Sequence, residues 1–260
     1  MSENNPNILA LDFDGVICDG LIEYFETAWR TYCQVWSPTN LTPPEDLAAR
    51  FYHLRPVIEV GWEMPVLLRA LLVGIPEEKI WQDWVAIAQQ ILVGEGLKAT
   101  DMGAKLDSIR DEWIASNLAE WLSLHRFYPG VVERLQQIIA SPVQLYIITT
   151  KEGRFVRQLL QEQNIAMSEG SIFGKEYRRP KSQLLIELIE ASAESPAIWF
   201  VEDRLKTLQG VKNQPELNEV RLYLADWGYN TQAQHESIRY DKRIQLLSLS
   251  QFAEDFSVWP

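Results

Sequence analysis

The spacing of apolar and polar residues changes twice along this chain. Ile8 to Leu11 is a short apolar run that ends in acidic residues, which predicts a buried strand leading into a loop. After residue 130, segments with strand spacing alternate with segments of helical spacing. We predict strands at 143–148, 197–201 and 220–224, and helices at 131–139, 153–163, 181–193 and between the last two strands. Strands that alternate with helices predict a parallel sheet covered on both faces.

The stretch between these parts, residues 19–125, follows helical spacing and contains no convincing strand. The first strand has no sheet partner near it in the sequence, so this stretch is predicted to be an insertion into one α/β core. The predicted fold is a doubly wound parallel-sheet core, residues 1–18 and 126–260, with an inserted α-helical cap, residues 19–125. An insertion placed directly after the first strand is either solvated structure or a lid over a site.

Composition and charge limit the partners. Of the 260 residues, 47% are hydrophobic and 23% charged, as in ordinary globular proteins, and the net charge of -12 disfavours a nucleic-acid partner. The two cysteines, Cys18 and Cys33, lack paired metal-ligand spacing and are predicted to be reduced thiols. Residues 1–7 lack the features of a signal peptide, and no apolar segment is long enough to span a bilayer. We therefore expect a cytoplasmic protein without a membrane partner, and the sequence does not define its oligomeric state.

Two aspartates at the end of the first strand are the first candidates for chemistry. Asp12 and Asp14 are two residues apart, so an extended backbone would point both side chains the same way, and Gly15 permits a turn after them. One carboxylate can attack phosphorus, while the other protonates the leaving oxygen and later activates water. The motif alone is weak evidence, because loops and calcium sites often contain it.

A second strand end carries hydroxyl groups and a cation. The predicted strand at 143–148 is followed directly by Thr149, Thr150 and Lys151. The hydroxyls can hold phosphoryl oxygens at this position. They can equally cap the helix that is predicted to follow, and the two roles are compatible because helix N-termini also bind anions.

A third strand end, after residues 197–201, carries the carboxylates of Glu202 and Asp203, which suit a hard divalent cation. Ligands of open α/β sheets bind beyond the carboxyl ends of the strands, so the three strand ends are expected to converge on one site. Four cations precede the third strand, and one of them could neutralise both a phosphate and the nucleophile. These cations are Lys175, Arg178, Arg179 and Lys181. In a chain of net charge -12, they predict a local positive patch.

Together these segments resemble the four motifs of the haloacid dehalogenase-like hydrolase superfamily, in the family's order. Residues 8–16 resemble the first motif, residues 147–149 the second, Lys181 the third and residues 200–203 the fourth. The resemblance covers the core from end to end. The helical insertion lies where that family carries a helical cap.

The resemblance implies roles for individual residues. Asp12 would be the nucleophile and Asp14 the general acid/base. Thr149 and Lys181 would bind the phosphate, with Thr150 as a further candidate. The implied Mg²⁺ site consists of Asp12, the backbone carbonyl of Asp14, Asp203 and, through water, Glu202. The resemblance also favours phosphoryl transfer over dehalogenation, because the dehalogenase branch generally lacks the second aspartate.

Two positions depart from the family's pattern. The third motif commonly has its lysine before proline, whereas here Pro180 precedes Lys181, so Lys175 is an alternative for the catalytic lysine. In the fourth motif, Glu202 and Asp203 stand where many relatives have glycine and aspartate, with another aspartate downstream. The acidic pair is expected to substitute for that arrangement.

We therefore predict a Mg²⁺-dependent phosphatase that hydrolyses a small phosphorylated metabolite through an aspartyl-phosphate. Two alternatives stay open. One is a phosphomutase of the same superfamily, which returns the phosphoryl group to a sugar. The other is a non-catalytic regulatory or binding protein that retains the fold.

Overall fold

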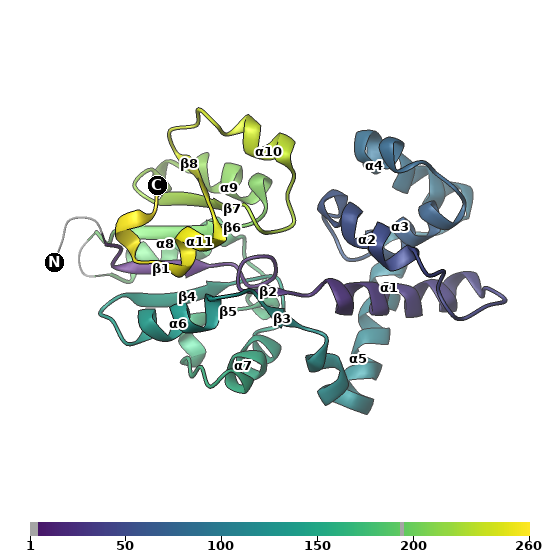
Figure 1. Ribbon diagram of the computed structural model, residues 1–260, viewed down its shortest axis with the longest axis horizontal. Coiled ribbons are helices and arrows are strands. Elements are labelled where there is room, and N and C mark those ends of the chain that lie inside the picture. Colours follow the sequence, from purple (N-terminus) through teal and green to yellow (C-terminus); the bar gives the residue numbers. More distant parts are fainter. Residues whose placement is uncertain (1–4, 193–194) are drawn as a thin grey trace. The chain divides into compact units, whose positions relative to one another are not determined.

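The computed structural model describes residues 5–192 and 195–260, which form two compact units. The first, called here the core unit, comprises the chain up to Asp19 and again from Arg126 to Pro260. The second, the helical unit, is the continuous segment from Gly20 to His125. Figure 1 shows that strands and helices alternate in the core unit, whereas the helical unit is built from helices. The chain of the core unit is thus interrupted by a separately packed body.

A six-stranded sheet lies at the centre of the core unit, and all its pairs are parallel, as the sequence predicted. Its spatial order is β5-β4-β1-β6-β7-β8. The strands are β1 (Ile8–Leu11), β4 (Gln144–Ile148), β5 (Ile172–Phe173), β6 (Ile198–Glu202), β7 (Arg221–Ala225) and β8 (Ile244–Leu247). Leu11 lies opposite Ile147 of β4 on one side and Val201 of β6 on the other. The strand that leads to Asp12 is therefore in the interior of the sheet.

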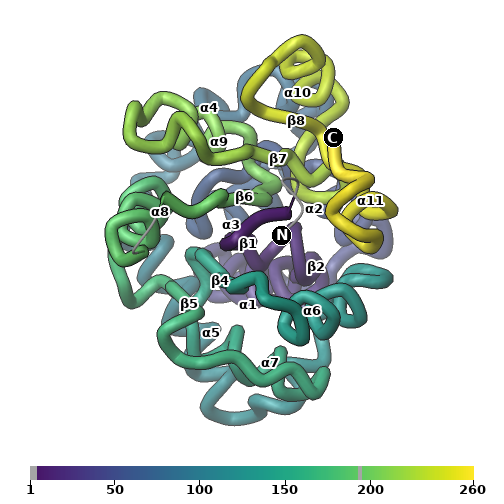
Figure 2. The backbone as a smooth tube through the Cα atoms, turned by 90° about the vertical axis from the view of Figure 1, so that its left-hand side faces the viewer, coloured from purple at the N-terminus to yellow at the C-terminus, as the bar shows by residue number. Residues whose placement is uncertain are grey.

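Helices cover both faces of this sheet, which confirms the predicted doubly wound fold. In Figure 2, α8 and α9 lie along one face, and α6 and α11 lie along the other. The α-helices are α6 (Val131–Ile139), α7 (Gly153–Glu162), α8 (Lys181–Glu190), α9 (Leu205–Lys212), α10 (Gln232–Ser237) and α11 (Leu249–Ala253). Short 3-10 helices are η2 (Glu169–Ser171), η3 (Lys175–Tyr177), η4 (Pro215–Leu217) and η5 (Phe256–Val258). The end predicted for α8, Ala193, lies outside the described residues.

Neighbouring residues of the central strands pack on opposite faces of the sheet. Phe200 of β6 belongs to the apolar cluster that includes Leu185 of α8. Trp199, the residue before it, contacts the rings of Phe256 and Trp259, with centroids 5.4 and 5.5 Å away. Burial of each such side chain stabilises the fold by about 1.5–3 kcal/mol. Because the central strands are held from both faces, the residues at their carboxyl ends have fixed positions.

Four short or peripheral strands were not predicted from the sequence. β5 has two residues and β8 four, and both lie at the edges of the sheet. The other two, β2 (Cys18–Asp19) and β3 (Arg126–Phe127), pair antiparallel at the points where the chain leaves and re-enters the core unit. Strands of two residues have no recognisable period, so tertiary contacts rather than local pattern define them.

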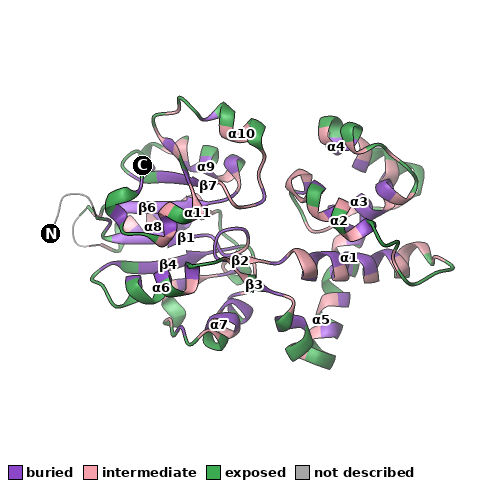
Figure 3. Cartoon of the chain, viewed as in Figure 1, coloured by how far each residue is buried: buried purple, intermediate pink, exposed green. Residues whose placement is uncertain are grey.

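The helical unit contains five α-helices and one 3-10 helix over residues 20–125. These are α1 (Leu21–Trp36), α2 (Leu47–Leu54), η1 (Arg55–Val57), α3 (Glu63–Leu72), α4 (Glu77–Gly94) and α5 (Ala99–Ser123). Helix α1 contacts both α3 and α5, and Figure 3 shows that buried residues recur along it. In the part of the chain that the structure describes, no helix is both long and apolar enough to cross a membrane. Cys18 and Cys33 are free thiols, as predicted.

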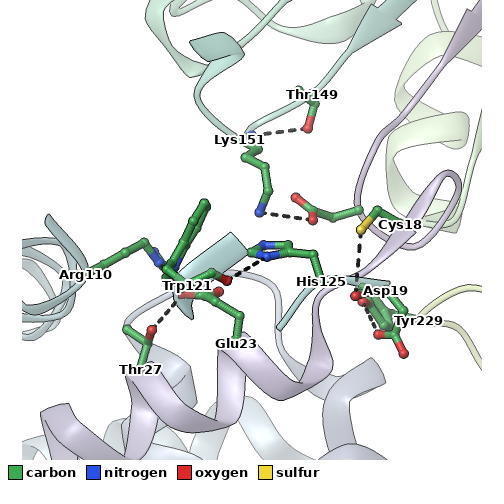
Figure 4. A network of polar contacts seen from close by, with 11 residues as sticks. Cys18, Asp19, Glu23, Thr27, Arg110, Trp121, His125, Thr149, Lys151 and Tyr229 are labelled. Atoms are coloured by element: carbon green, nitrogen blue, oxygen red, sulfur yellow. Dashed lines mark hydrogen bonds and ion pairs between the residues drawn. The ribbon is translucent and has the colours of Figure 1, made fainter. Parts of the chain in front are cut away.

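A buried carboxylate joins the first and last helices of this unit. The side chain of Glu23 in α1 is fully buried and accepts hydrogen bonds from Thr27 Oγ1 at 2.6 Å and Trp121 Nε1 at 3.0 Å. Arg110 of α5 donates to it through Nε at 2.7 Å and Nη2 at 3.3 Å. Figure 4 shows these residues around Glu23. A buried charge with this many donors fixes the register of α1 against α5.

We expect Glu23→Gln to lower the free energy of unfolding by about 3 kcal/mol, because it removes a buried charge that balances the partly buried guanidinium of Arg110. Asp107→Asn is the matched control, since Asp107 lies 3.8 Å from the same Arg110 but its side chain is 51% exposed. That pair should contribute less than about 1 kcal/mol. Urea unfolding followed by tryptophan fluorescence measures both values. Equal effects of the two variants would show that burial of Glu23 is not what stabilises the unit.

Candidate active site

The loop after β1 places two aspartates at the carboxyl end of the sheet. The backbone N–H of Asp12 donates to the carbonyl of Val201 at 2.9 Å, which continues the pairing of β1 with β6 beyond the strand. Gly15 then turns the chain with a φ of +88°, in the left-handed region that favours glycine. A Cβ atom at Gly15 would lie 2.3 Å from Asp203 Oδ2. Gly15 is therefore required both for the turn and for the close approach of Asp203.

Lys181 joins the nucleophile candidate to the acidic pair. It is the first residue of α8, and its Nζ lies 2.7 Å from Asp12 Oδ1 and 2.6 Å from Glu202 Oε2. Lys175, the alternative lysine, is exposed in η3, where its backbone N–H donates to the carbonyl of Lys151 at 2.9 Å. The structure thus brings Lys181 to Asp12, although Pro180 precedes it.

The two residues at the end of β6 have different surroundings. Glu202 receives the ammonium of Lys181 on one oxygen, and its Oε1 accepts the backbone N–H groups of Asp203 at 3.1 Å and Arg204 at 3.0 Å. Asp203 Oδ2 accepts the backbone N–H of Tyr229 at 2.8 Å. Glu202 is therefore held by three donors, whereas Asp203 is oriented by a turn that follows β7.

Burial and mutual repulsion change the acidity of this cluster. Burial, followed by the charge of Glu202, raises the pKa of Asp12 to about 7, against the opposing effect of Lys181. Burial also raises the pKa of Glu202 to about 7 and raises that of Asp203. Burial alone would lower the pKa of Lys181, but Asp12 and Glu202 raise it above its ordinary value. The ammonium of Lys181 contacts Asp12 and Glu202, and Asp203 is a third buried carboxylate of the same group. This buried cluster therefore has one cationic group for three acidic groups.

These carboxylates fit a divalent cation. Asp12, Glu202 and Asp203 each offer an oxygen within 4.8 Å of the others, and all three residues are buried. Carboxylate oxygens are the ligands that hard ions such as Mg²⁺ prefer, and a cation would balance the excess charge. The side chain of Asp14 lies outside this group. The backbone carbonyl of Asp14 stays a predicted ligand.

Thr149 and Thr150 follow β4, the neighbour of β1. Thr149 is buried, and its Oγ1 accepts the backbone N–H of Lys151 at 3.1 Å. Neither threonine caps α7, which begins at Gly153 without a side-chain cap. The N–H of Gly153 donates to Glu176 Oε2 at 3.1 Å, so a carboxylate already occupies this helix end. Thr149 lies at the site end of its strand, whereas Thr150 is exposed.

Sequence reasoning missed Lys151 as a site residue. Its Nζ lies 3.2 Å from Asp14 Oδ1, and both side chains are largely buried. Figure 4 shows the side chain of Lys151 pointing away from Thr149, with a dashed line from its ammonium to the neighbouring carboxylate. The two aspartates therefore contact different lysines, Lys181 for Asp12 and Lys151 for Asp14. Its position directly after the two threonines was the available signal, but the sequence alone did not indicate its partner.

The pKa shifts predict how stability depends on pH and Mg²⁺. The pKa values of Asp12 and Glu202 are higher in the folded state than in the unfolded state. Protonation of these two groups therefore stabilises the folded state. In chelator, their contribution to the free energy of unfolding should therefore fall as pH rises from about 4 to 7. Mg²⁺ binds the ionised carboxylates, so we expect it to raise the melting temperature by roughly 5 °C at pH 8, at about a hundred-fold over Kd.

At pH 5.5 the same Mg²⁺ concentration should have much less effect, because protons compete for the carboxylates. Thermal unfolding at both pH values, with Mg²⁺ and with chelator, measures this difference. Asp203→Asn should lose most of the shift at pH 8, whereas Glu216→Gln on the exposed surface should keep it. If Mg²⁺ raised the melting temperature by the same amount at both pH values, this prediction would be wrong.

Comparison with solved structures identifies the fold. The chain is similar to a haloacid dehalogenase-like family hydrolase from Streptococcus pneumoniae, with a TM-score of 0.55 and 15% identity over 92% of this chain and 94% of that one. It is also similar to a predicted phosphoglycolate phosphatase from Haemophilus somnus (TM-score 0.59, 15% identity, 95% of each chain). A third similar structure is protein tyrosine kinase A of Mycobacterium tuberculosis (TM-score 0.58, 15% identity, 96% and 98%).

No protein-family model and no curated protein matches the sequence. At 12–17% identity, a likeness to solved structures shows the fold alone. This fold is that of the haloacid dehalogenase-like hydrolases, which confirms the fold predicted from the four motifs. Proteins with this fold carry names of different reactions, so the function of this chain has to be argued from its site.

Proposed function

We propose that the chain is a Mg²⁺-dependent phosphatase that hydrolyses a small phosphorylated metabolite through an aspartyl-phosphate at Asp12. The arrangement around Asp12 is the observation that carries the proposal. Asp12 is buried at the end of a central strand, 2.7 Å from the ammonium of Lys181, in a group of three carboxylates. A second carboxylate, Asp14, follows two residues later and is held by Lys151.

In the first step, a carboxylate oxygen of Asp12 attacks phosphorus while the bond from phosphorus to the leaving oxygen breaks. Asp14 enters this step in its protonated form and donates that proton to the leaving oxygen, so the product leaves as an alcohol. The ammonium of Lys181 neutralises charge on the phosphoryl oxygens and on Asp12. The hydroxyl of Thr149 is the candidate donor to a phosphoryl oxygen, since Thr149 directly follows β4, the strand next to β1.

In the second step, Asp14 takes a proton from water, whose oxygen attacks the phosphorus of the aspartyl-phosphate. The bond to Asp12 breaks, phosphate is released, and the carboxylate of Asp12 is restored. Asp14 thus acts first as an acid and then as a base, which returns the site to its starting protonation state.

A cation would be held by Asp12 and Asp203, with Glu202 close by and the Asp14 carbonyl as a further predicted ligand. When bound, Mg²⁺ supplies charge neutralisation that lets an anionic carboxylate approach an anionic phosphate. Glu202 also holds the ammonium of Lys181, so it positions that residue whether or not it contacts the cation.

Phosphate release from a panel of phosphorylated metabolites, with Mg²⁺ and with excess chelator, tests this proposal. The panel should include sugar phosphates and phosphorylated hydroxy acids such as phosphoglycolate, because a structural neighbour carries that name. We expect release from at least one compound that chelator abolishes. Isomerisation of a sugar phosphate without release would favour the phosphomutase alternative, and binding without either reaction would favour the non-catalytic one.

A further inference from the structure

The turn that follows β7, residues 226–230, packs directly on Asp203. The N–H of Tyr229 donates to Asp203 Oδ2 at 2.8 Å, and Asn230 Nδ2 donates to the backbone carbonyl of Asp203 at 2.9 Å. A Cβ atom on Gly228 would lie 2.3 Å from Asp203 Cβ and 2.6 Å from the carbonyl oxygen of Gly15. This contact leaves no room for a side chain at position 228. The turn therefore determines where the carboxylate of Asp203 lies.

The same turn also contacts Val16 and Asp19. These residues belong to the segment of the core unit that runs from the two aspartates to the start of the helical unit. The hydroxyl of Tyr229 donates to Asp19 Oδ1 at 2.8 Å, and Trp227 Nε1 donates to the carbonyl of Val16 at 3.1 Å. Asp19 is the second residue of β2, and the helical unit begins at the next residue. Figure 4 shows Tyr229 beside Asp19 and Cys18. One residue, Tyr229, thus binds Asp203 through its backbone and β2 through its side chain.

Other side chains hold the turn itself in place. Asn230 Nδ2 also donates to the carbonyl of Ala225 at 2.7 Å, and His235 Nε2 lies 2.5 Å from Asn230 Oδ1. Arg204 Nη1 donates to the carbonyl of Tyr229 at 3.2 Å. These hydrogen bonds come from several segments and make the turn rigid. A displacement of β2 would therefore move Asp203 as well, because the turn cannot change shape to compensate.

We propose that Tyr229 is a positioning residue that couples β2 to the cation ligand Asp203. In this arrangement the hydrogen bond from Tyr229 to Asp19 stabilises the orientation of Asp203 that binds the cation. The proposal rests on the proposed function for the identity of the cation site. It concerns binding of Mg²⁺, so it can be tested without measuring hydrolysis.

A double-mutant cycle with Tyr229→Phe and Asp19→Asn tests the coupling. Tyr229→Phe keeps the ring and the backbone N–H to Asp203 but removes the hydroxyl. Asp19→Asn removes the charge of the acceptor. Calorimetric titration of Mg²⁺ at pH 8 should show affinity weakened by about 10-fold in each single variant, as for other residues that support metal ligands. The double variant should be no weaker than either single one, because both changes act on the same hydrogen bond.

Tyr240→Phe is the matched control, because its side chain is 87% exposed, and it should leave Mg²⁺ affinity unchanged. Gly228→Ala is a second probe, and we expect an even larger loss of affinity because Asp203 must move. Circular dichroism in chelator verifies that each variant is folded. Unchanged affinity in both single variants, losses that multiply in the double variant, or absence of Mg²⁺ binding by the unaltered chain would overturn the proposal.

The two proposals fail in distinguishable ways. If the unaltered chain binds Mg²⁺ but hydrolyses no phosphate ester, the proposed phosphatase function fails while the cycle still measures the coupling. If hydrolysis is Mg²⁺-dependent but the hydroxyl of Tyr229 has no effect on affinity, the coupling fails while the phosphatase function stands.

Discussion

Asp12→Asn should abolish Mg²⁺-dependent phosphate release, with a loss of at least about a thousand-fold in kcat, because an amide cannot form the aspartyl-phosphate. The variant should nevertheless fold well. Burial raises the pKa of Asp12 to about 7, so its charge at pH 8 is costly in the folded state. Removal of one carboxylate from the buried group of Asp12, Glu202 and Asp203 is therefore expected to preserve or increase stability in chelator.

Glu219→Gln provides the matched control for this prediction, since Glu219 is an exposed acidic residue of the same unit. It should keep full activity and the stability of the unaltered chain. Phosphate release that survives in Asp12→Asn, at a rate within about ten-fold of the original, would rule out Asp12 as the nucleophile. If Asp12→Asn loses both phosphate release and the folded structure, then Asp12 stabilises the fold. That result would contradict the expectation drawn from the raised pKa of Asp12.

Lys181→Met should reduce both activity and stability. Its ammonium lies within 2.7 Å of carboxylate oxygens from Asp12 and Glu202, and only 13% of its side chain is exposed. Removing one partner of a buried charge network costs about 3 kcal/mol or more. The loss should be larger at pH 8 than at pH 5.5, because both carboxylates, with pKa values of about 7, are ionised only at the higher pH.

Loss of a charge that stabilises the transition state typically lowers kcat by about 10²–10³-fold, and we expect Lys181→Met to fall in that range. Lys175→Met is the control, because Lys175 is the other lysine that the sequence offered for this role and lies exposed in η3. It should change neither kcat nor stability appreciably. A large effect of Lys175→Met with a small effect of Lys181→Met would reverse the assignment. Steady-state kinetics and urea unfolding provide both readouts.

The central part of the fold was predictable because its strands are apolar on both faces. The strands β1 and β6 are buried throughout, so they appear in the sequence as continuous apolar runs that end in acidic residues. The strands β2, β3 and β5 have two residues each, and only their pairing defines them. The sequence pattern predicts a helix or a strand only where buried positions recur along it. A segment of two residues is too short to show such a pattern.

The candidate site was predictable in its strand-end residues and less so in their partners. Asp12, Thr149 and Glu202 lie at the carboxyl ends of three adjacent strands of one parallel sheet, so topology alone brings them together. The choice of Lys181 over Lys175 required the geometry of α8, which begins at Lys181. That start places the ammonium between two carboxylates.

Contacts between loops that are distant in the sequence were beyond sequence reasoning. The hydrogen bond from Tyr229 to Asp19 joins residues separated by 210 positions, and the ion pair of Lys151 with Asp14 joins two different strand ends. No period or motif encodes such contacts, because they depend on how each loop leaves its strand. The glycines at positions 15 and 228 gave a partial signal, since both permit close approach to Asp203.

Detection of a phosphorylated Asp12 during turnover tests the central claim most directly. The unaltered chain would be mixed with Mg²⁺ and a substrate that it hydrolyses, and the reaction would be quenched in acid within milliseconds. The protein would then be digested for mass spectrometry of its peptides. We predict one added phosphoryl group on the peptide that contains Asp12, absent in chelator and absent from Asp12→Asn. Turnover without any phosphorylated peptide, or with the phosphoryl group on another residue, would contradict the proposed mechanism.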